Sequence, residues 1–218
     1  MTNISKTPKK IATRTELFTA AVSALEGQGW RVERIARSGK SSVRRITKGN
    51  AVKTVSIRTS QDTWIAFPRN EVNDGWSTLA DVDYVIASSV DDRYDPRNAQ
   101  VHMIAGDEMR ARFDRAYAAR KKAGYVMPVG RGIWVSLYDK ESDSPVTLVG
   151  AGAGLDNLSI ARIPLVGLKA PQRLACTEGD DPEENDAEDE LLTIAEAKRR
   201  LALSLGVKEA DIKISINS

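Results

Sequence analysis

Four short strand patterns directly follow one helix pattern in residues 13–67, and this order constrains the fold more than any other feature. Thr13 and Glu16 form a capping box, in which the two side chains satisfy free amides at a helix start. The expected helix carries an apolar stripe with Leu17 and Leu25 on it and ends at Gly27. Strands are expected at 30–35, 42–47, 52–60 and 64–67.

The second half of the main domain predicts more strands and one further helix. The near-continuous apolar run at 83–88 is typical of a central strand. Asp107 is expected to cap a helix that ends at Gly124, with Arg112 and Arg115 on its outer side. Further strands are expected at 100–105, 133–138, 146–149 and 159–163. The predicted class is α/β (α+β), a mixed central sheet flanked by helices.

Charge is distributed unevenly along the 218 residues, although the net charge is only +2. Residues 178–190 hold nine acidic side chains and no basic one. Residues 31–58 hold nine Lys or Arg side chains against a single acid, Glu33. A basic block of this density favours a polyanion as partner, while a well-solvated basic face is the alternative.

These shifts in composition divide the chain into four parts. We expect a basic N-terminal arm at 1–12, an α/β domain at 13–170, an acidic linker at 171–190 and a helix-strand tail at 191–218. The acidic linker is predicted to be disordered and to compete with nucleic acid for the basic block. The tail is too short to fold alone, so we expect it to pair with the domain or to mediate self-association.

Several classes of protein are disfavoured by what the sequence lacks. No apolar run approaches the roughly 18 residues of a membrane span, and the first ten residues do not resemble a secretory signal, so no membrane partner is expected. Cys176 is the single cysteine, so it can form neither an intramolecular disulfide nor a cysteine zinc site. We expect a cytoplasmic protein without cofactors.

Residues 13–123 resemble the restriction-endonuclease-like, or PD-(D/E)XK, nuclease superfamily. The segment 29–32, Gly-Trp-Arg-Val, is similar to the family's entry from the first helix into the first strand. The segments 55–60 and 64–67, followed by 83–86, are similar to its core hairpin and the strand beyond. The resemblance implies a restriction-endonuclease-like core in the sheet.

The family's catalytic positions are not filled by catalytic residues in this sequence. The resemblance places Ser56 and Arg58 where the family has an acid and a lysine, and the strand before them has no acid. Serine is a poor Mg²⁺ ligand, whereas arginine suits a phosphate. The resemblance therefore implies a degenerate site that binds an anion in place of the metal.

Other motifs indicate structure more than chemistry. Gly39-Lys40-Ser41 lacks the first glycine of a phosphate-binding loop, and the glycines at 150, 152 and 154 are interpreted as a flexible turn. His102 lies in an apparent strand as a packed, neutral side chain. Three aromatic residues are able to stack on bases, although core packing is the default for them. They are Trp64, Phe67 and Trp76.

We therefore predict a non-catalytic nucleic-acid-binding protein, with DNA favoured over RNA. The alternatives are a metal-dependent nuclease that uses Asp81, Asp83 or Glu16, and a module that binds an acidic protein. Phosphate contacts set affinity without reading sequence. The residues predicted to make them are Arg31, Arg34, Arg37, Lys40, Arg44, Arg45, Lys53, Arg58, Arg112 and Arg115.

Overall fold

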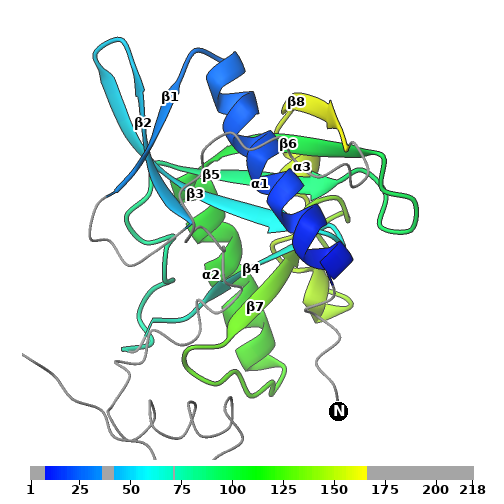
Figure 1. Cartoon of the computed structure of the whole chain (residues 1–218). Helices are drawn as coiled ribbons and strands as arrows, with labels where there is room; N and C mark the ends of the chain where they lie inside the picture. The colour runs from blue at the N-terminus through cyan, green and yellow to red at the C-terminus, as the bar shows by residue number, and fades with distance from the viewer. Residues whose placement is uncertain (1–7, 36–41, 71, 166–218) are drawn as a thin grey trace, which may run out of the picture.

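The structure is a computed structural model that describes residues 8–35, 42–70 and 72–165. A twisted sheet runs through its centre, with α1 on one face and α2 on the other (Figure 1). The elements are α1 (Pro8–Gly27), β1 (Arg31–Arg34), β2 (Val43–Lys48), β3 (Ala51–Ser60), β4 (Trp64–Pro68), β5 (Tyr84–Val90), β6 (Asn98–Ala105), α2 (Gly106–Lys122), β7 (Gly132–Ser136), η2 (Val146–Leu148), α3 (Ala153–Asp156) and β8 (Ser159–Pro164).

The main sheet of the described residues has the strand order β1-β2-β3-β5-β6-β8. β1, β2 and β3 form an antiparallel meander, and β3 is parallel to β5, with Val55 opposite Tyr84. β6 and β8 continue the sheet as antiparallel strands. A parallel pair needs a crossover connection, and residues 61–83 provide it. Within this crossover β4 leaves the main sheet and pairs with β7.

Helix α1 covers one face of the sheet. Its apolar stripe, which includes Leu17 and Leu25, packs on Ile46, Val55 and other side chains of the same face. The Ser88 hydroxyl donates a hydrogen bond of 2.8 Å to the backbone carbonyl of Leu17. The first half of α1 is thereby fixed against the end of β5.

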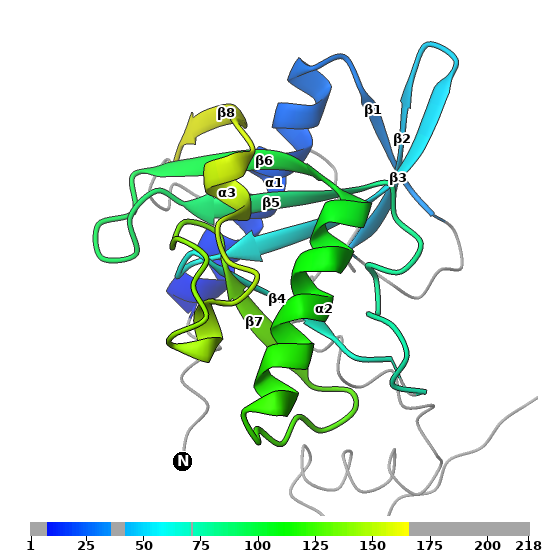
Figure 2. The same ribbon diagram turned by 180° about the vertical axis from the view of Figure 1, so that it is seen from behind.

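The opposite face is covered by α2 and by the β4–β7 ribbon, as the view from behind shows (Figure 2). Phe113 of α2 meets Phe67 of β4 edge to face, with 5.1 Å between ring centres, and Trp76 at 5.3 Å. Gly106 lets α2 begin tightly against the entry to β5, since a Cβ there would lie 2.1 Å from the Val82 carbonyl oxygen. The two faces give the sheet two separate cores.

Two predicted helix starts are wrong. α1 begins at Pro8, so the expected capping box at Thr13 lies inside the helix, and residues 8–12 do not belong to a separate arm. Proline fits the first turn of a helix because the amide it lacks has no partner there. The N-cap of α2 is Ala105, and no side chain caps it, so Asp107 is a first-turn residue.

Within the described residues the strand predictions are confirmed with small shifts of boundary, with one exception. Residues 146–149 were expected as a strand and instead contain the short 3-10 helix η2. The class, a mixed sheet with helices, is confirmed. The acidic linker, the tail and most of the arm lie outside the described residues, and within those residues no helix could span a membrane.

Candidate nucleic-acid interface

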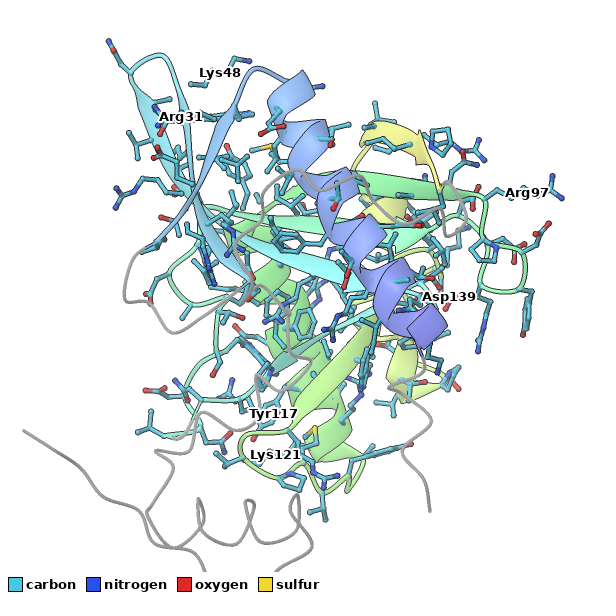
Figure 3. All side chains as sticks on the ribbon, in the orientation of Figure 1. Arg31, Lys48, Arg97, Tyr117, Lys121 and Asp139 are labelled. Carbon is cyan, nitrogen blue, oxygen red and sulfur yellow. The ribbon has the colours of Figure 1, made fainter. Side chains whose placement is uncertain are left out.

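The basic strands lie together at one end of the sheet. We define the basic wing as residues 31–34 and 43–53, which are β1, β2 and the beginning of β3. Arg31 and Lys48 lie at this end of the molecule in Figure 3, far from Arg97 and Lys121. Glu33 is the only acidic residue of the wing. Arg37 and Lys40 fall outside the described residues.

The cations of the wing are divided between two faces. Residues opposite each other in an antiparallel pair share a face of the sheet. The β1–β2 register puts Arg31 and Arg45 on the face of α2. It puts Arg34 and Lys48 on the face of α1, where Ile46 is buried. The wing therefore presents positive charge around an edge of the sheet and not as one flat surface.

Weak surface contacts hold several of these cations. Arg31 forms an ion pair of 2.8 Å with Glu33, and both side chains are exposed. Such a pair is worth about 0–1 kcal/mol, so a phosphate can replace the carboxylate at little cost. Lys53 donates to Asp83 at 3.0 Å. Arg45 is exposed and makes no ion pair with any described residue.

Two predicted phosphate contacts are wrong, because Arg44 and Arg112 are both buried, at 6% exposure each. The Arg44 guanidinium lies 5.1 Å from the centre of the Phe18 ring and donates to the Val43 carbonyl. Arg112 was expected on the outer side of its helix. It instead points into the protein, where its charge is met by Glu108 at 2.9 Å and by Asp156.

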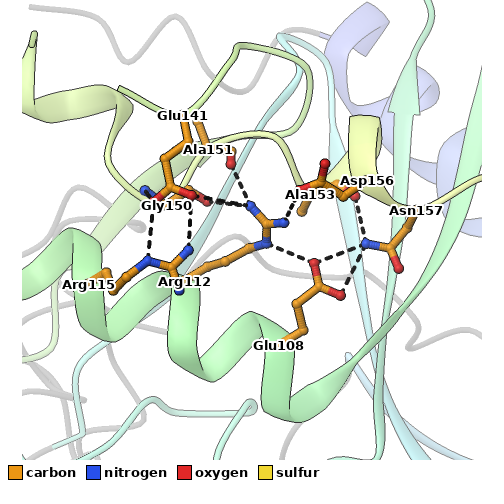
Figure 4. A network of polar contacts seen from close by, with 9 residues as sticks. All are labelled: Glu108, Arg112, Arg115, Glu141, Gly150, Ala151, Ala153, Asp156 and Asn157. Atoms are coloured by element: carbon orange, nitrogen blue, oxygen red, sulfur yellow. Dashed lines mark hydrogen bonds and ion pairs between the residues drawn. The ribbon is translucent and has the colours of Figure 1, made fainter. Parts of the chain in front are cut away.

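The Arg112 network also contacts the glycine-rich loop (Figure 4). The sequence predicted a flexible turn here, and the structure places Gly154 in the short helix α3. Arg112 donates to the Ala151 carbonyl, and a Cβ on Gly150 would lie 2.4 Å from the Arg112 carbonyl oxygen. Next to it, Arg115 makes two hydrogen bonds to Glu141, at 3.2 and 3.0 Å. These bonds hold the pKa of the Glu141 carboxyl below its ordinary value. Arg115 already has a carboxylate partner, in contrast to Arg45.

The degenerate catalytic positions are closed to ligands. Ser56 is fully buried, and its hydroxyl has no hydrogen-bond partner within the described residues. Arg58 lies with its guanidinium carbon 4.4 Å from the centre of the Phe67 ring and donates to the Thr78 hydroxyl. An anion cannot reach Ser56 in this arrangement, so the expected anion site at these two positions is not formed.

The acids considered for a nuclease do not converge. Asp83 accepts hydrogen bonds from the Thr54 amide at 2.7 Å and from Lys53, and these hold its pKa below the ordinary value. Glu16 belongs to the part of α1 beside the carboxyl end of β5, whereas Asp83 precedes the amino end of that strand. Asp81 is exposed beside Asp83. No cluster of three metal-ligating side chains occurs among the described residues.

His102 is buried, as predicted for a packed neutral histidine. Burial lowers its pKa. Since the Asn157 carbonyl can only accept, Nδ1 of His102 donates to it at 2.8 Å. In the neutral ring Nε2 then accepts from the Tyr138 hydroxyl at 3.0 Å, and the Tyr138 oxygen accepts from Ser89 at 2.7 Å. This linear chain of hydrogen bonds joins β5, β6 and the segment after β7.

A cleft of about 540 Å³ lies at the opposite end of β3 from the basic wing. It opens where the carboxyl ends of the parallel strands β3 and β5 meet the beginning of α1. In open α/β sheets this edge is the usual place for a ligand. The polar and aromatic residues of its lining include Lys10, Arg14, Asp62, Trp64, Arg93, Tyr94 and Trp134.

The segment between β5 and β6, which carries Arg93 and Tyr94, is held in place by Asp91. The Asp91 carboxylate accepts hydrogen bonds from the backbone amides of Arg97 and Asn98 and from the Arg162 side chain. Burial opposes ionisation of Asp91, but these hydrogen bonds outweigh it and hold the pKa of the carboxyl well below its usual range. This wall of the cleft is therefore fixed at its base.

The aromatic residues separate into core and cleft. Phe67 and Trp76 are buried, as core packing predicts, so neither is able to stack on a base. Trp64 lines the cleft, and the sequence interpretation missed Tyr94 and Trp134 beside it. Trp134 alternates with buried Ile133 and Val135, a period-two pattern that places it on the outer face of a strand. That alternation is the signal from which Trp134 could have been identified.

Comparison with known proteins gives no relative for this chain. No protein-family model, no curated protein and no solved structure matches it.

Proposed function

We propose that this protein binds nucleic acid through its basic wing and does not cleave it. The supporting observation is the wing itself, in which Arg31, Arg34, Arg45 and Lys48 are exposed and Glu33 is the only acid. Positive charge around an exposed sheet edge attracts the negatively charged phosphate backbone of nucleic acid. Phosphate contacts of this kind give affinity without base readout, and DNA remains the expected partner over RNA.

Descent from a nuclease-like fold is part of this proposal. The order of α1, β1, β2 and β3, with β5 parallel to β3, supports the resemblance to the PD-(D/E)XK superfamily. The closed position of Ser56 favours a binding protein over an active metal-dependent nuclease, because a cation there would have neither a carboxylate ligand nor access.

The acidic residues 178–190 are proposed to weaken this binding in cis. They carry nine negative charges, close to the net charge of +8 on residues 31–58. A segment of the same chain competes at an effective concentration in roughly the millimolar range. Deletion of residues 178–190 should therefore raise the affinity for nucleic acid most at low salt, where screening is weakest.

The test is a salt titration of binding to a labelled duplex, followed by fluorescence anisotropy. Arg31→Ala combined with Arg45→Ala should lower the affinity and reduce the slope of log affinity against log salt by about 1.8, since each phosphate contact contributes roughly 0.9. Lys121→Ala combined with Lys122→Ala removes the same charge from the exposed end of α2. This control should leave the slope unchanged.

Three outcomes would count against the proposal. Equal effects of the two double variants would mean that binding follows net charge and not the wing. Binding to an acidic protein that bulk DNA cannot displace would favour the alternative of a protein-interaction module. Cleavage is tested separately with Mg²⁺ or Mn²⁺, and activity that survives repurification and is lost in Asp83→Ala would establish the nuclease alternative.

A further inference from the structure

The cleft at the far end of β3 combines three features that the basic wing lacks: concave shape, aromatic side chains and fixed walls. Its volume of about 540 Å³ falls within the roughly 300–1,000 Å³ of pockets that hold small organic ligands. A nucleotide is a ligand of that size. The β3–β4 turn is tied to the start of α1, because the Gln61 side chain donates to the Lys10 carbonyl at 2.7 Å.

Trp134 is the most informative residue of the cleft. Trp134 is 51% exposed, although Ile133 and Val135, the residues before and after it in β7, are both buried. Its backbone is fixed, since Arg120 donates to the Trp134 carbonyl at 2.6 Å and β7 pairs with β4. An indole on a backbone fixed in this way, in a residue about half exposed, is available to stack on a planar ligand.

Trp64 extends the same aromatic surface. In the β4–β7 register Trp64 lies opposite Ser136, and Ala66 lies opposite Trp134. The two tryptophans therefore share one face of the ribbon as diagonal neighbours, a relationship that puts their Cα atoms about 7–8 Å apart. Tyr94, which is 86% exposed, stands across the cleft on the segment between β5 and β6.

Charge in the cleft favours an anionic ligand. Lys10 and Arg14 approach from α1 and Arg93 from the segment between β5 and β6, against a single acid, Asp62. The Asp62 carboxylate is engaged locally, because it accepts from the Ser60 hydroxyl at 3.1 Å and the Trp64 amide at 3.2 Å. The Arg93 guanidinium lies 5.1 Å from the centre of the Tyr94 ring, so cation and ring are presented side by side.

We propose that this cleft binds unpaired nucleotides, with a base stacked on Trp134 and the phosphates beside Arg14 and Arg93. The inference rests on the proposed function and names the substrate class more closely as single-stranded nucleic acid or the frayed end of a duplex. Bases inside a duplex cover each other's faces, so an aromatic side chain reaches them only where they are unpaired. Stacking is tolerant of sequence, so the cleft selects strandedness and not a particular base.

The experiment compares two probes of equal length on the full chain, an oligo(dT) single strand and a closed hairpin, that is, a duplex whose two ends are both joined by non-nucleotide linkers so that no base is unpaired. Trp134→Ala should weaken oligo(dT) binding by about 5- to 150-fold, the effect of losing one base–aromatic stack. It should leave binding of the closed hairpin unchanged. An oligo(U) arm of the titration distinguishes RNA from DNA as the source of the single strand.

Tyr125→Ala is the matched control, because Tyr125 is 52% exposed and does not line the cleft. It should bind oligo(dT) like the unmodified protein, whereas Trp134→Phe should retain most of the affinity. Photocrosslinking of the unmodified protein to oligo(dT) with 5-iodouracil at its centre should give an adduct on a peptide that contains Trp134 or Tyr94. This readout does not depend on the folding of any variant.

The inference and the proposed function fail in different ways. If Trp134→Ala binds oligo(dT) normally and the adduct maps to the basic wing, the cleft does not bind nucleotides although the protein binds nucleic acid. Equal losses for oligo(dT) and the closed hairpin would also overturn the inference, because the cleft would not distinguish unpaired bases. If the unmodified protein binds neither probe at low salt, the proposed function itself is wrong.

Discussion

The guanidinium carbon of Arg58 lies 4.4 Å from the centre of the Phe67 ring, and the same group donates to the Thr78 hydroxyl. Arg58 thus connects β3 to the crossover that leads into β5. Arg58 was predicted from the sequence to contact phosphate, and it instead makes contacts within the protein.

Arg58→Ala should therefore lower stability. Loss of the contact with the ring and of the hydrogen bond should reduce the free energy of unfolding by about 1–3 kcal/mol. Arg93→Ala removes a similar contact with an exposed ring and should cost less than about 1 kcal/mol. Urea denaturation checks both values, and equal losses in the two variants would contradict the role given to Arg58.

Arg112 should be far more important for folding than its neighbour Arg115. Arg112→Ala removes a buried guanidinium that donates to Glu108, Asp156 and the Ala151 carbonyl, and loss of these charge-assisted hydrogen bonds should cost about 1.5–3 kcal/mol. Arg115→Ala breaks a half-exposed pair with Glu141 and should cost less than about 1 kcal/mol. The thermal midpoints of the two variants test this, and an Arg112→Ala protein as stable as Arg115→Ala would argue against the network.

Substitution of Gly150 and of Gly124 measures separately the cost of the left-handed backbone conformation and the cost of steric crowding. Both have positive φ, at +84° and +81°, but only Gly150 lies against another segment. Gly124→Ala should cost about 1–2 kcal/mol for the left-handed conformation alone. Gly150→Ala should cost about 1–3 kcal/mol more, because its Cβ would collide with the Arg112 backbone. Equal unfolding free energies for the two variants would mean that the loop gives way easily.

Because His102 is buried, the free energy of unfolding should depend on pH in a direction that can be predicted. Burial lowers its folded pKa from 6.5, so below pH 6.5 the unfolded chain takes up a proton that the folded protein does not. Stability should fall as pH decreases below 6.5, by at most about 1.4 kcal/mol per pH unit from this group. Unfolding measured between pH 7 and 5 should show the slope, and His102→Gln should flatten it. An unchanged slope in that variant would assign the effect to other groups.

Period-two and helical patterns in the sequence were sufficient to predict most of the helices and strands of the described residues. The alternation of Val55 and Ile57 placed β3 correctly, and Met109 and Phe113 identified the buried side of α2. Helix starts were predicted less well, because a capping box such as the one at Thr13 is a local signal and the same residues can also lie inside a helix. Proline at position 8 gave an earlier start that the pattern did not include.

The candidate site was harder to predict, since charge in a sequence does not reveal burial. Arg44 and Arg45 are adjacent and look equivalent in the sequence. On β2 they point to opposite faces, so that Arg44 is buried beneath α1 and Arg45 is exposed to solvent. The cleft depended on pairing between β4 and β7, which brings Trp64 near Trp134 from 70 residues away. No local pattern encodes such a contact.

Strand β3 joins the two proposed binding surfaces, with Lys53 at the wing and Ser60 at the cleft. Seven steps of roughly 3.3 Å separate these residues, or about 23 Å. Stacked nucleotides advance about 3.4 Å each along a strand. A nucleic acid that occupies both surfaces at once must therefore span at least this distance, which corresponds to about seven base steps of a stacked duplex.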